Sequence, residues 1–359
     1  MQKEKQDITT YFNISFEMGL KQIVRFSLNN PRLAYSAAKL YLAYRLAEKK
    51  RAAFLKQGVQ VPPMVIFSIT NDCNLDCIGC YAKILHQTSA EELTPQQFRS
   101  VIQQARDLGV SVILLAGGEP LMRKELLDTI KEFPSLIFLL FTNGTLLDSA
   151  AIQNIKKQRN ILPVISIEGD QQDTDLRRGG GIYERAMQIF SKLKQEKMLF
   201  GTSITQTSRN FDLVNDETYL TDMMEKGCKV FFFINYLPIN PQTHDLALTP
   251  QQVMSHLAIL EELREKHSAL FMAFPGGEVE LGGCLAGGKG LIHINPQGDL
   301  QPCPFSPFSD VNLREMSLLQ ALRSRHLQVI RNSGNRLDES DGACALWKNK
   351  SWVEELYKN

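Results

Sequence analysis

Residues 65–81 read VIFSITNDCNLDCIGCY, and the interpretation of the whole sequence starts from this stretch. An apolar run of β-forming residues leads into a short loop that carries Cys73, Cys77 and Cys80, with the spacing Cys-x3-Cys-x2-Cys. Three thiolates on one loop favour an iron–sulfur cluster or a zinc ion, and a disulfide remnant is the third alternative. Zinc would need a fourth ligand, and the nearest His, His86, would have to fold back. A [4Fe–4S] cluster held by the three cysteines would keep one iron open.

The cysteine loop resembles that of the radical S-adenosylmethionine (radical SAM) enzymes. In that family this spacing stands on the loop after the first strand of a partial (β/α) barrel, and the open iron binds the amino and carboxylate groups of SAM. The resemblance implies reductive cleavage of SAM to a 5′-deoxyadenosyl radical, with an electron donor such as flavodoxin or ferredoxin. One position departs from the family. Gly79 stands where an aromatic residue usually contacts adenine, which leaves Ile78 or Tyr81 for this contact.

Length and composition describe a globular protein of more than one unit. The 359 residues suffice for one barrel and a smaller appended unit, and 43% are hydrophobic against 22% charged. No apolar run reaches the roughly 18 residues of a transmembrane helix. The N-terminus does not match a signal peptide. Seven cysteines grouped on loops suit a reducing compartment. We therefore expect a cytoplasmic protein.

The first 60 residues are basic, with eleven Lys and Arg against four Asp and Glu. Because the whole chain has 40 basic and 39 acidic residues, this excess is local, and we expect no nucleic-acid partner. Residues 11–57 are expected to form two or three helices, with a break at Pro31 and apolar positions at helical spacing from Leu33 to Phe54. We expect a helical cap on the outside of the barrel. The alternative is a basic amphipathic surface for peripheral membrane contact or a carrier peptide.

From residue 64 onward, apolar strands alternate with helices. The strands are expected at 64–69, 111–115, 136–141, 162–167, 199–205 and 229–234. The helices are expected at 95–109, 123–133, 147–157, 183–197, 213–226 and 250–267. Continuous apolar strands separated by helices indicate a parallel sheet that is buried on both faces. The predicted fold class is α/β, with six units forming a partial (β/α)6 barrel of the radical SAM type and not the eight of a full barrel.

Parallel barrels place their chemistry at the C-terminal ends of the strands. Gly117, Gly118 and Glu119 follow the second strand, where paired glycines allow close backbone approach and the carboxylate supplies an acceptor. The resemblance implies that this Gly-Gly-Glu-Pro turn grips the ammonium group of SAM. Without the resemblance it could be a plain strand-to-helix turn. Residues 142–144, Thr-Asn-Gly, follow the third strand and are also typical of the family.

The ends of the next strands carry further polar side chains. Ser166 and Glu168 end the fourth strand, where the family commonly contacts the ribose hydroxyls of SAM. Ser203 on the fifth strand is a candidate for the same contact, and Asn235 at the end of the sixth strand is another.

An arginine before a glycine run, residues 177–181, resembles the family's partner of the SAM carboxylate. A guanidinium suits a carboxylate because its donors form a planar fork. Arg178 is our candidate and Arg177 the second choice, while a solvated basic turn is the plain alternative. Cys228, outside both cysteine triplets, is interpreted as a small buried residue, with hydrogen-atom donation to a substrate radical as the alternative.

Residues 276–359 contain the second triplet, Cys284, Cys303 and Cys344. An apolar strand and a Pro-x-Gly turn predict a hairpin before Cys303, and a helix is expected at about 317–331. This order resembles the auxiliary-cluster domain of the SPASM and twitch radical SAM enzymes, in the short twitch form, and implies a second [4Fe–4S] cluster. A cluster-free domain with three packing cysteines is the alternative. His293 is expected to point outward from the hairpin and not to bind iron.

The auxiliary pattern lacks one ligand. Trp347 stands where the family's next cysteine is expected, and Trp cannot bind iron. Either a group such as Asp341 completes the shell, or one iron is open to substrate or solvent.

These patterns divide the chain into an N-terminal helical extension (1–60), a radical SAM partial barrel (61–275) and a small α+β auxiliary-cluster domain (276–359). The resemblance implies an enzyme whose radical abstracts hydrogen from a peptide or peptidyl substrate. The same chemistry on a small molecule or membrane lipid is one alternative, and a non-catalytic Fe–S scaffold or sensor is another. No peptide-recognition winged helix is recognisable in the first 60 residues, which weakens the peptide hypothesis without removing it.

Overall fold

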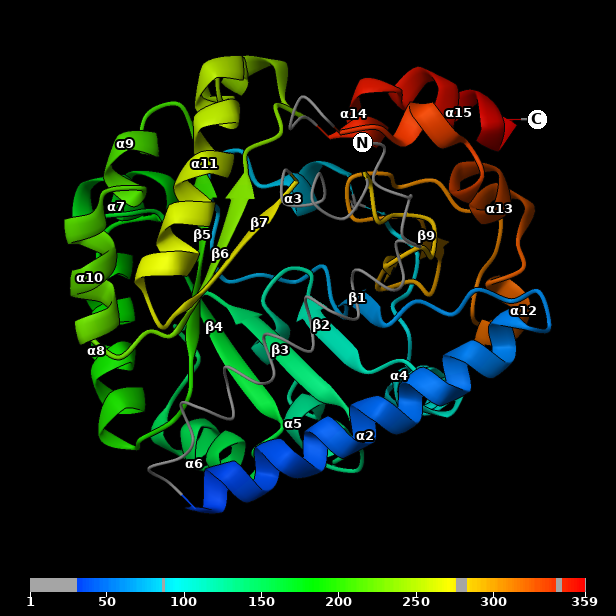
Figure 1. The fold of residues 1–359 in the computed structure, drawn as a ribbon, viewed down its shortest axis with the longest axis horizontal. Coiled ribbons are helices and arrows are strands. Elements are labelled where there is room, and N and C mark those ends of the chain that lie inside the picture. Colours follow the sequence, from blue (N-terminus) through cyan, green and yellow to red (C-terminus); the bar gives the residue numbers. More distant parts are fainter. Residues whose placement is uncertain (1–30, 86–87, 276–282, 340–343, 359) are drawn as a thin grey trace.

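The computed structural model describes residues 31–85, 88–275, 283–339 and 344–358. Its centre is a nine-stranded sheet in the order β7-β6-β5-β4-β3-β2-β1-β8-β9 (Figure 1). Strands β1 to β7 pair in parallel, β8 pairs in parallel with β1, and β9 pairs antiparallel with β8. The strands are β1 (Met64–Ser68), β2 (Val112–Ala116), β3 (Ile137–Thr142), β4 (Ile161–Ile167), β5 (Gly201–Gln206), β6 (Val230–Asn235), β7 (Leu270–Phe274), β8 (Leu291–Ile294) and β9 (Leu300–Gln301).

Helices connect the parallel strands and cover the sheet, so the expected mostly parallel partial barrel is confirmed. The helices of the barrel are α3 (Tyr81–Leu85), α4 (Pro95–Leu108), α5 (Leu126–Ile130), α6 (Ser149–Gln158), α7 (Gln171–Arg178), α8 (Ile182–Gln195), α9 (Phe211–Val214), α10 (Glu217–Glu225) and α11 (Pro250–Lys266). The outer segments add α2 (Pro31–Leu55), α12 (Leu318–Ala321), α13 (Arg325–Arg331), α14 (Ala345–Lys348) and α15 (Lys350–Lys358).

Helix α4 shows how the local sequence sets an element's ends. Thr94 accepts a hydrogen bond from the N–H of Gln97, and the Gln97 side chain accepts one from the N–H of Thr94. Pro95 stands in the first turn, where its missing N–H leaves no hydrogen bond unmade. Gly109 follows the helix with a φ of 100°, a left-handed conformation that glycine adopts without strain. The predicted helix at 95–109 is therefore confirmed.

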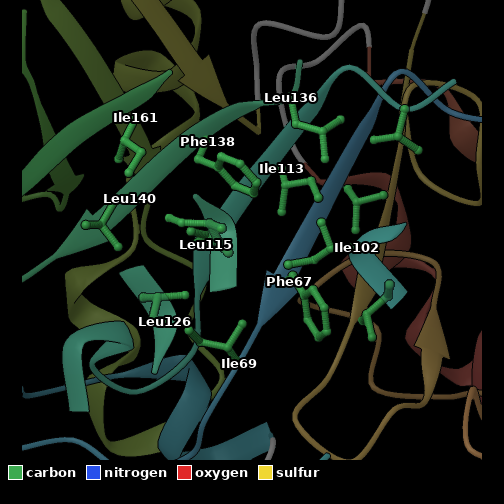
Figure 2. Close-up of a cluster of buried hydrophobic side chains, with 14 of the residues drawn as sticks. Phe67, Ile69, Ile102, Ile113, Leu115, Leu126, Leu136, Phe138, Leu140 and Ile161 are labelled. Atoms are coloured by element: carbon green, nitrogen blue, oxygen red, sulfur yellow. The ribbon is translucent and has the colours of Figure 1, made fainter. Parts of the chain in front are cut away.

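The largest hydrophobic cluster fills the space between the sheet and its helices. Phe67 of β1, Leu115 of β2 and Phe138 of β3 are fully buried in one cluster with Ile102 of α4 (Figure 2). Side chains that alternate along each strand face the other way, toward the inside of the curled sheet. The strand ends on that inner side form the candidate site.

Helix α2 lies along the outside of the molecule and packs against α4 (Figure 1). Arg51 is 4% exposed, and its Nη1 donates to the carbonyl oxygen of Gly109 at 2.6 Å and to Ser111 Oγ at 2.8 Å. These contacts support a packed cap. On the same helix Tyr35, Leu42 and Leu46 are exposed. Within the described ranges, no helix has the length and apolar character required to cross a membrane.

Several sequence-based expectations differ from the structure. Strand β7 was not expected, the predicted helix at 213–226 is divided into α9 and α10, and that at 317–331 into α12 and α13. The predicted helices before Pro31 lie outside the described residues. The hairpin β8–β9 is present, but β8 also extends the barrel sheet beside β1, so the predicted boundary at residue 275 is not a break in the sheet.

The outward orientation expected for His293 is wrong. Its side chain is fully buried, with Nε2 2.8 Å from Ser68 Oγ and Nδ1 2.7 Å from Gln301 Oε1. β8 pairs with β1 as well as with β9, so His293 lies on an inner strand of the sheet and not in an isolated hairpin. Both ring nitrogens have hydrogen-bond partners within the protein, and the expectation that His293 is not an iron ligand stays a prediction.

Candidate functional site

One cavity brings the two cysteine triplets together. It opens at the C-terminal ends of the barrel strands, and its lining includes Cys73, Cys77, Cys80, Cys284, Cys303 and Cys344. The first three cysteines are partly exposed and the last three are buried, and all six are free thiols. The sequence predicted two separate sets of metal ligands, and in the structure both sets line the same cavity.

The Gly-Gly-Glu turn packs directly against the cysteine loop. The N–H of Gly118 donates to the carbonyl oxygen of Thr70 at 2.7 Å, and that of Glu119 to the carbonyl oxygen of Asp72 at 2.8 Å. A Cβ atom at Gly117 or Gly118 would overlap these same two carbonyl oxygens. The paired glycines are therefore needed for this close approach, which fixes the cysteine loop at the end of β1.

Glu119 ties the turn to the end of β3. Its carboxylate is 1% exposed and accepts hydrogen bonds from Thr142 Oγ1 at 2.7 Å and from the N–H of Asn143 at 2.8 Å. Burial raises the pKa of Glu119, and these hydrogen bonds oppose the rise. Gly117, Gly118 and Glu119 all line the cavity, as their predicted contact with the SAM ammonium group requires.

Ser166 and Ser203 meet on neighbouring strands. They are directly paired in the register of β4 and β5, their hydroxyl oxygens are 3.0 Å apart, and both line the cavity. Asn235 also lines the cavity, and its Nδ2 donates to the carbonyl oxygen of Pro275 at 2.8 Å. The arrangement suits the predicted contact of the two serines with the ribose, which stays a prediction.

Glu168 lies behind the cavity wall and is not among the lining residues, unlike Arg177 and Arg178. Its Oε1 accepts from both guanidinium groups, at 2.7 Å from Arg178 Nε, and its Oε2 accepts from the N–H of Thr205 at 2.9 Å. The carboxylate therefore orients both arginines. Its predicted contact with the ribose has no support in this geometry, whereas both candidate arginines face the cavity.

Gly79 has a φ of +67°, and a side chain at this position would overlap the ring of Tyr236. Tyr236 follows β6, is 6% exposed and lines the cavity, with its hydroxyl 2.6 Å from Thr243 Oγ1. Ile78 is 47% exposed, and Tyr81 packs on Phe305 of the C-terminal region with 4.9 Å between ring centroids. Sequence reasoning missed Tyr236 because it lies far from the cysteine loop in the chain.

The second triplet lies in a hydrophobic cluster of its own, which also contains Leu285 and Leu346. Burial raises the pKa of the Cys284 thiol well above its usual value, and Glu339 adds to this rise. Glu339 also lines the cavity and was not predicted from the sequence. Asp341, one of the two alternatives considered for completing the auxiliary shell, lies outside the described residues.

The donor sets fit iron–sulfur clusters. In the described part of the chain, no three His, Cys, Asp or Glu side chains converge so as to hold a single metal ion. A cubane cluster does not require such convergence, because each thiolate binds a different iron. Each triplet supplies three soft sulfur donors on one cavity, which is the ligand type that iron–sulfur clusters take.

Cys228 stands apart from both triplets. It is fully buried in the barrel core, its Sγ donates to the carbonyl oxygen of Val230, and it is not among the residues that line the cavity. Burial raises the pKa of Cys228 to about 12. The structure supports its interpretation as a packing residue.

Comparison with known proteins agrees with this site. The model of the radical SAM superfamily matches residues 67–207, a range that includes the first cysteine triplet, the Gly-Gly-Glu turn and the arginine pair. Residues 67–207 therefore form a radical SAM domain, as expected from the sequence, and enzymes of this superfamily use a [4Fe–4S] cluster and SAM.

Two curated relatives come from Methanosarcina barkeri. An Fe-coproporphyrin III synthase is 28% identical over 65% of this chain, which spans 59% of that protein's length. An AdoMet-dependent heme synthase is 23% identical over 71% of this chain and 80% of its own length. Among solved structures, Streptococcus suis SuiB bound to precursor peptide SuiA has a TM-score of 0.64 over 80% of this chain and 71% of its own, at 19% identity. This likeness shows the shared fold.

Proposed function

We propose that this chain reductively cleaves SAM at a [4Fe–4S] cluster held by Cys73, Cys77 and Cys80, and that the resulting radical abstracts hydrogen from a substrate in the shared cavity. The observation that carries the proposal is the packing of the Gly-Gly-Glu turn against the cysteine loop, with polar strand ends around the same cavity. When bound, the cluster and SAM supply one-electron cleavage to a 5′-deoxyadenosyl radical.

The protein's own residues would bind and orient SAM. The backbone at Gly117 and Gly118 would accept hydrogen bonds from the ammonium group of SAM. Arg178 would bind the carboxylate of SAM through its guanidinium group, which Glu168 holds in place. Ser166 and Ser203 would present their hydroxyls to the ribose. We assign the adenine contact to Tyr236, since its ring occupies the space beside Gly79.

The second triplet would hold an auxiliary [4Fe–4S] cluster on the far side of the cavity. Cys284, Cys303 and Cys344 are buried together there, in the order Cys, hairpin, Cys, helix, Cys of the twitch domains. A substrate in the cavity would then lie between SAM and this cluster.

A peptide or peptidyl substrate is our first candidate, and the fold shared with SuiB, solved with a precursor peptide, supports it. A compact small molecule is the second, and the relatives that are Fe-coproporphyrin III and heme synthases support it. Apolar side chains from several strands line the cavity, including Ile66, Leu114, Phe141 and Ile234, and would suit an apolar group of either substrate.

The test is formation of 5′-deoxyadenosine by anaerobically reconstituted protein with dithionite and SAM. Wild type should form it, and the triple Cys73→Ala, Cys77→Ala, Cys80→Ala variant should not. Cys228→Ala is the matched control, because this cysteine lies outside the cavity and should leave turnover unchanged. Equal turnover in the triple variant and the control would refute the proposal. Adding candidate peptides or tetrapyrroles and following deuterium transfer into 5′-deoxyadenosine would separate the two substrate classes.

A further inference from the structure

We propose that the carboxylate of Glu339 is the fourth protein ligand of the auxiliary cluster, in place of the cysteine that the chain lacks. The inference rests on the proposed auxiliary cluster and adds a metal ligand to it. Its basis is that Glu339 lines the cavity together with Cys284, Cys303 and Cys344 and that the backbone holds it beside two of them.

Backbone contacts fix Glu339 beside two of the three cysteines. Its Oε1 accepts a hydrogen bond from the N–H of Ala345, the residue after Cys344, at 2.8 Å. On the other side, the N–H of Cys284 donates to the carbonyl oxygen of Leu337 at 2.9 Å. The segment that carries Glu339 is therefore held between the segments of Cys284 and Cys344.

Burial makes this carboxylate unusual. Glu339 is 1% exposed, and both of its carboxylate oxygens are buried. Transfer of a carboxylate from water to such a position costs free energy unless hydrogen bonds, a cation or a metal compensate. The neighbouring residue Asp338 is exposed, so its carboxylate remains in water and this free-energy cost does not arise.

The charge of Glu339 suits this ligand set. Glu339 lines the same cavity as Cys284, Cys303 and Cys344. Three thiolates and a carboxylate on one cavity would repel one another, and bound iron would convert this repulsion into attraction.

Trp347, at the position expected for cysteine, does not compete for this role. It offers no donor atom for iron, it is not among the cavity-lining residues, and Lys350 Nζ lies 4.7 Å from the centre of its ring. An oxygen ligand is harder than a thiolate and binds this iron less strongly. The iron bound by Glu339 would thus be the one that exchanges its ligand most readily, and Glu339 itself lines the cavity.

The test uses full-length protein in which Cys73, Cys77 and Cys80 are all changed to Ala, so that the auxiliary cluster alone contributes to the signal. This protein should bind about four irons per chain. Glu339→Gln should lose about one of these four, and the oxidised protein should show the EPR signal of a [3Fe–4S] cluster. Glu339→Cys should keep all four with a changed spectrum, which also shows that the altered site still folds. Asp338→Asn is the control and should match the parent.

The possible results distinguish the absence of the auxiliary cluster from a wrong assignment of Glu339 as its ligand. If the parent triple variant binds no iron, the auxiliary cluster itself is absent, and the ligand assignment falls with it. If the parent binds about four irons, and Glu339→Gln keeps the iron content and EPR spectrum of Asp338→Asn, then Glu339 is not a ligand while the proposed cluster stands.

Discussion

At the scale of single residues, the arginine pair depends on one buried carboxylate. Glu168 is 1% exposed and binds Arg177, Arg178 and the N–H of Thr205. We expect Glu168→Gln to lower the free energy of unfolding by about 3–5 kcal/mol, because two largely buried guanidinium groups lose their counter-charge. SAM affinity should fall as well, since Arg178 is no longer held toward the cavity. Thermal unfolding and equilibrium dialysis with SAM measure the two effects.

Asp173→Asn is a suitable control, since this residue lies on the same helix, α7, and is not among the cavity-lining residues. A Glu168→Gln protein with the stability and SAM affinity of this control would contradict the positioning role.

Two substitutions at Tyr236 test separately whether its ring and its hydroxyl contribute to SAM binding. Tyr236→Leu removes the ring beside Gly79 and should raise the dissociation constant of SAM up to about tenfold, because an aromatic contact contributes about 0.5–1.5 kcal/mol. Tyr236→Phe loses only the hydroxyl that contacts Thr243 and should retain nearly wild-type affinity. Equal affinities for all three proteins would remove Tyr236 from the adenine site.

At the scale of elements, α2 is attached to the barrel by Arg51. We expect Arg51→Met to lower the free energy of unfolding by about 1–3 kcal/mol, because the carbonyl of Gly109 and the hydroxyl of Ser111 lose a buried donor. Arg45→Met, on the exposed side of the same helix, should stay within about 0.5 kcal/mol of wild type. Urea denaturation provides the comparison, and identical midpoints for both variants would show that α2 is not held in this way.

The same helix gives a prediction about membranes. If α2 is a packed cap, the intact protein should not co-sediment with anionic vesicles, even though Tyr35, Leu42 and Leu46 are exposed. Salt-sensitive co-sedimentation would instead support the basic amphipathic surface considered from the sequence, since screening weakens attraction to anionic lipid.

The elements also show what sequence could and could not predict. Five of the strands from β1 to β6 were predictable because each is a largely apolar run between turn signals, whereas β5 reads GTSITQ and is mostly polar. The cysteine loop and the Gly-Gly-Glu turn were predictable because their residues are adjacent in the chain. Burial of His293 and the meeting of Gly79 with Tyr236 were not, because each depends on which distant segments pack together.

The burial of Glu339 was likewise not predictable from the sequence. Its burial beside Cys284 follows from the contact of the segment after α13 with the start of the C-terminal region. A single acidic residue in a polar stretch gives no sign of this in the sequence.

At the scale of the whole molecule, β8 pairs with β1 and brings the second cysteine triplet to the open end of the barrel. Two clusters on one cavity predict about eight irons per chain in wild-type protein. Replacing either triplet with alanines should leave about four, as measured by iron and sulfide analysis. Loss of all iron from the Cys73, Cys77 and Cys80 variant would mean that the second triplet holds no independent cluster.

The measurement that tests the central claim most directly is the EPR spectrum of dithionite-reduced protein before and after SAM is added. Direct binding of SAM to the open iron should change the spectrum of wild type and of the variant in which Cys284, Cys303 and Cys344 are alanines. The variant in which Cys73, Cys77 and Cys80 are alanines should show no change on SAM addition. A SAM-induced change that survives in this variant, or a spectrum that SAM leaves unaltered in wild type, would contradict a SAM-binding cluster on the first cysteine triplet.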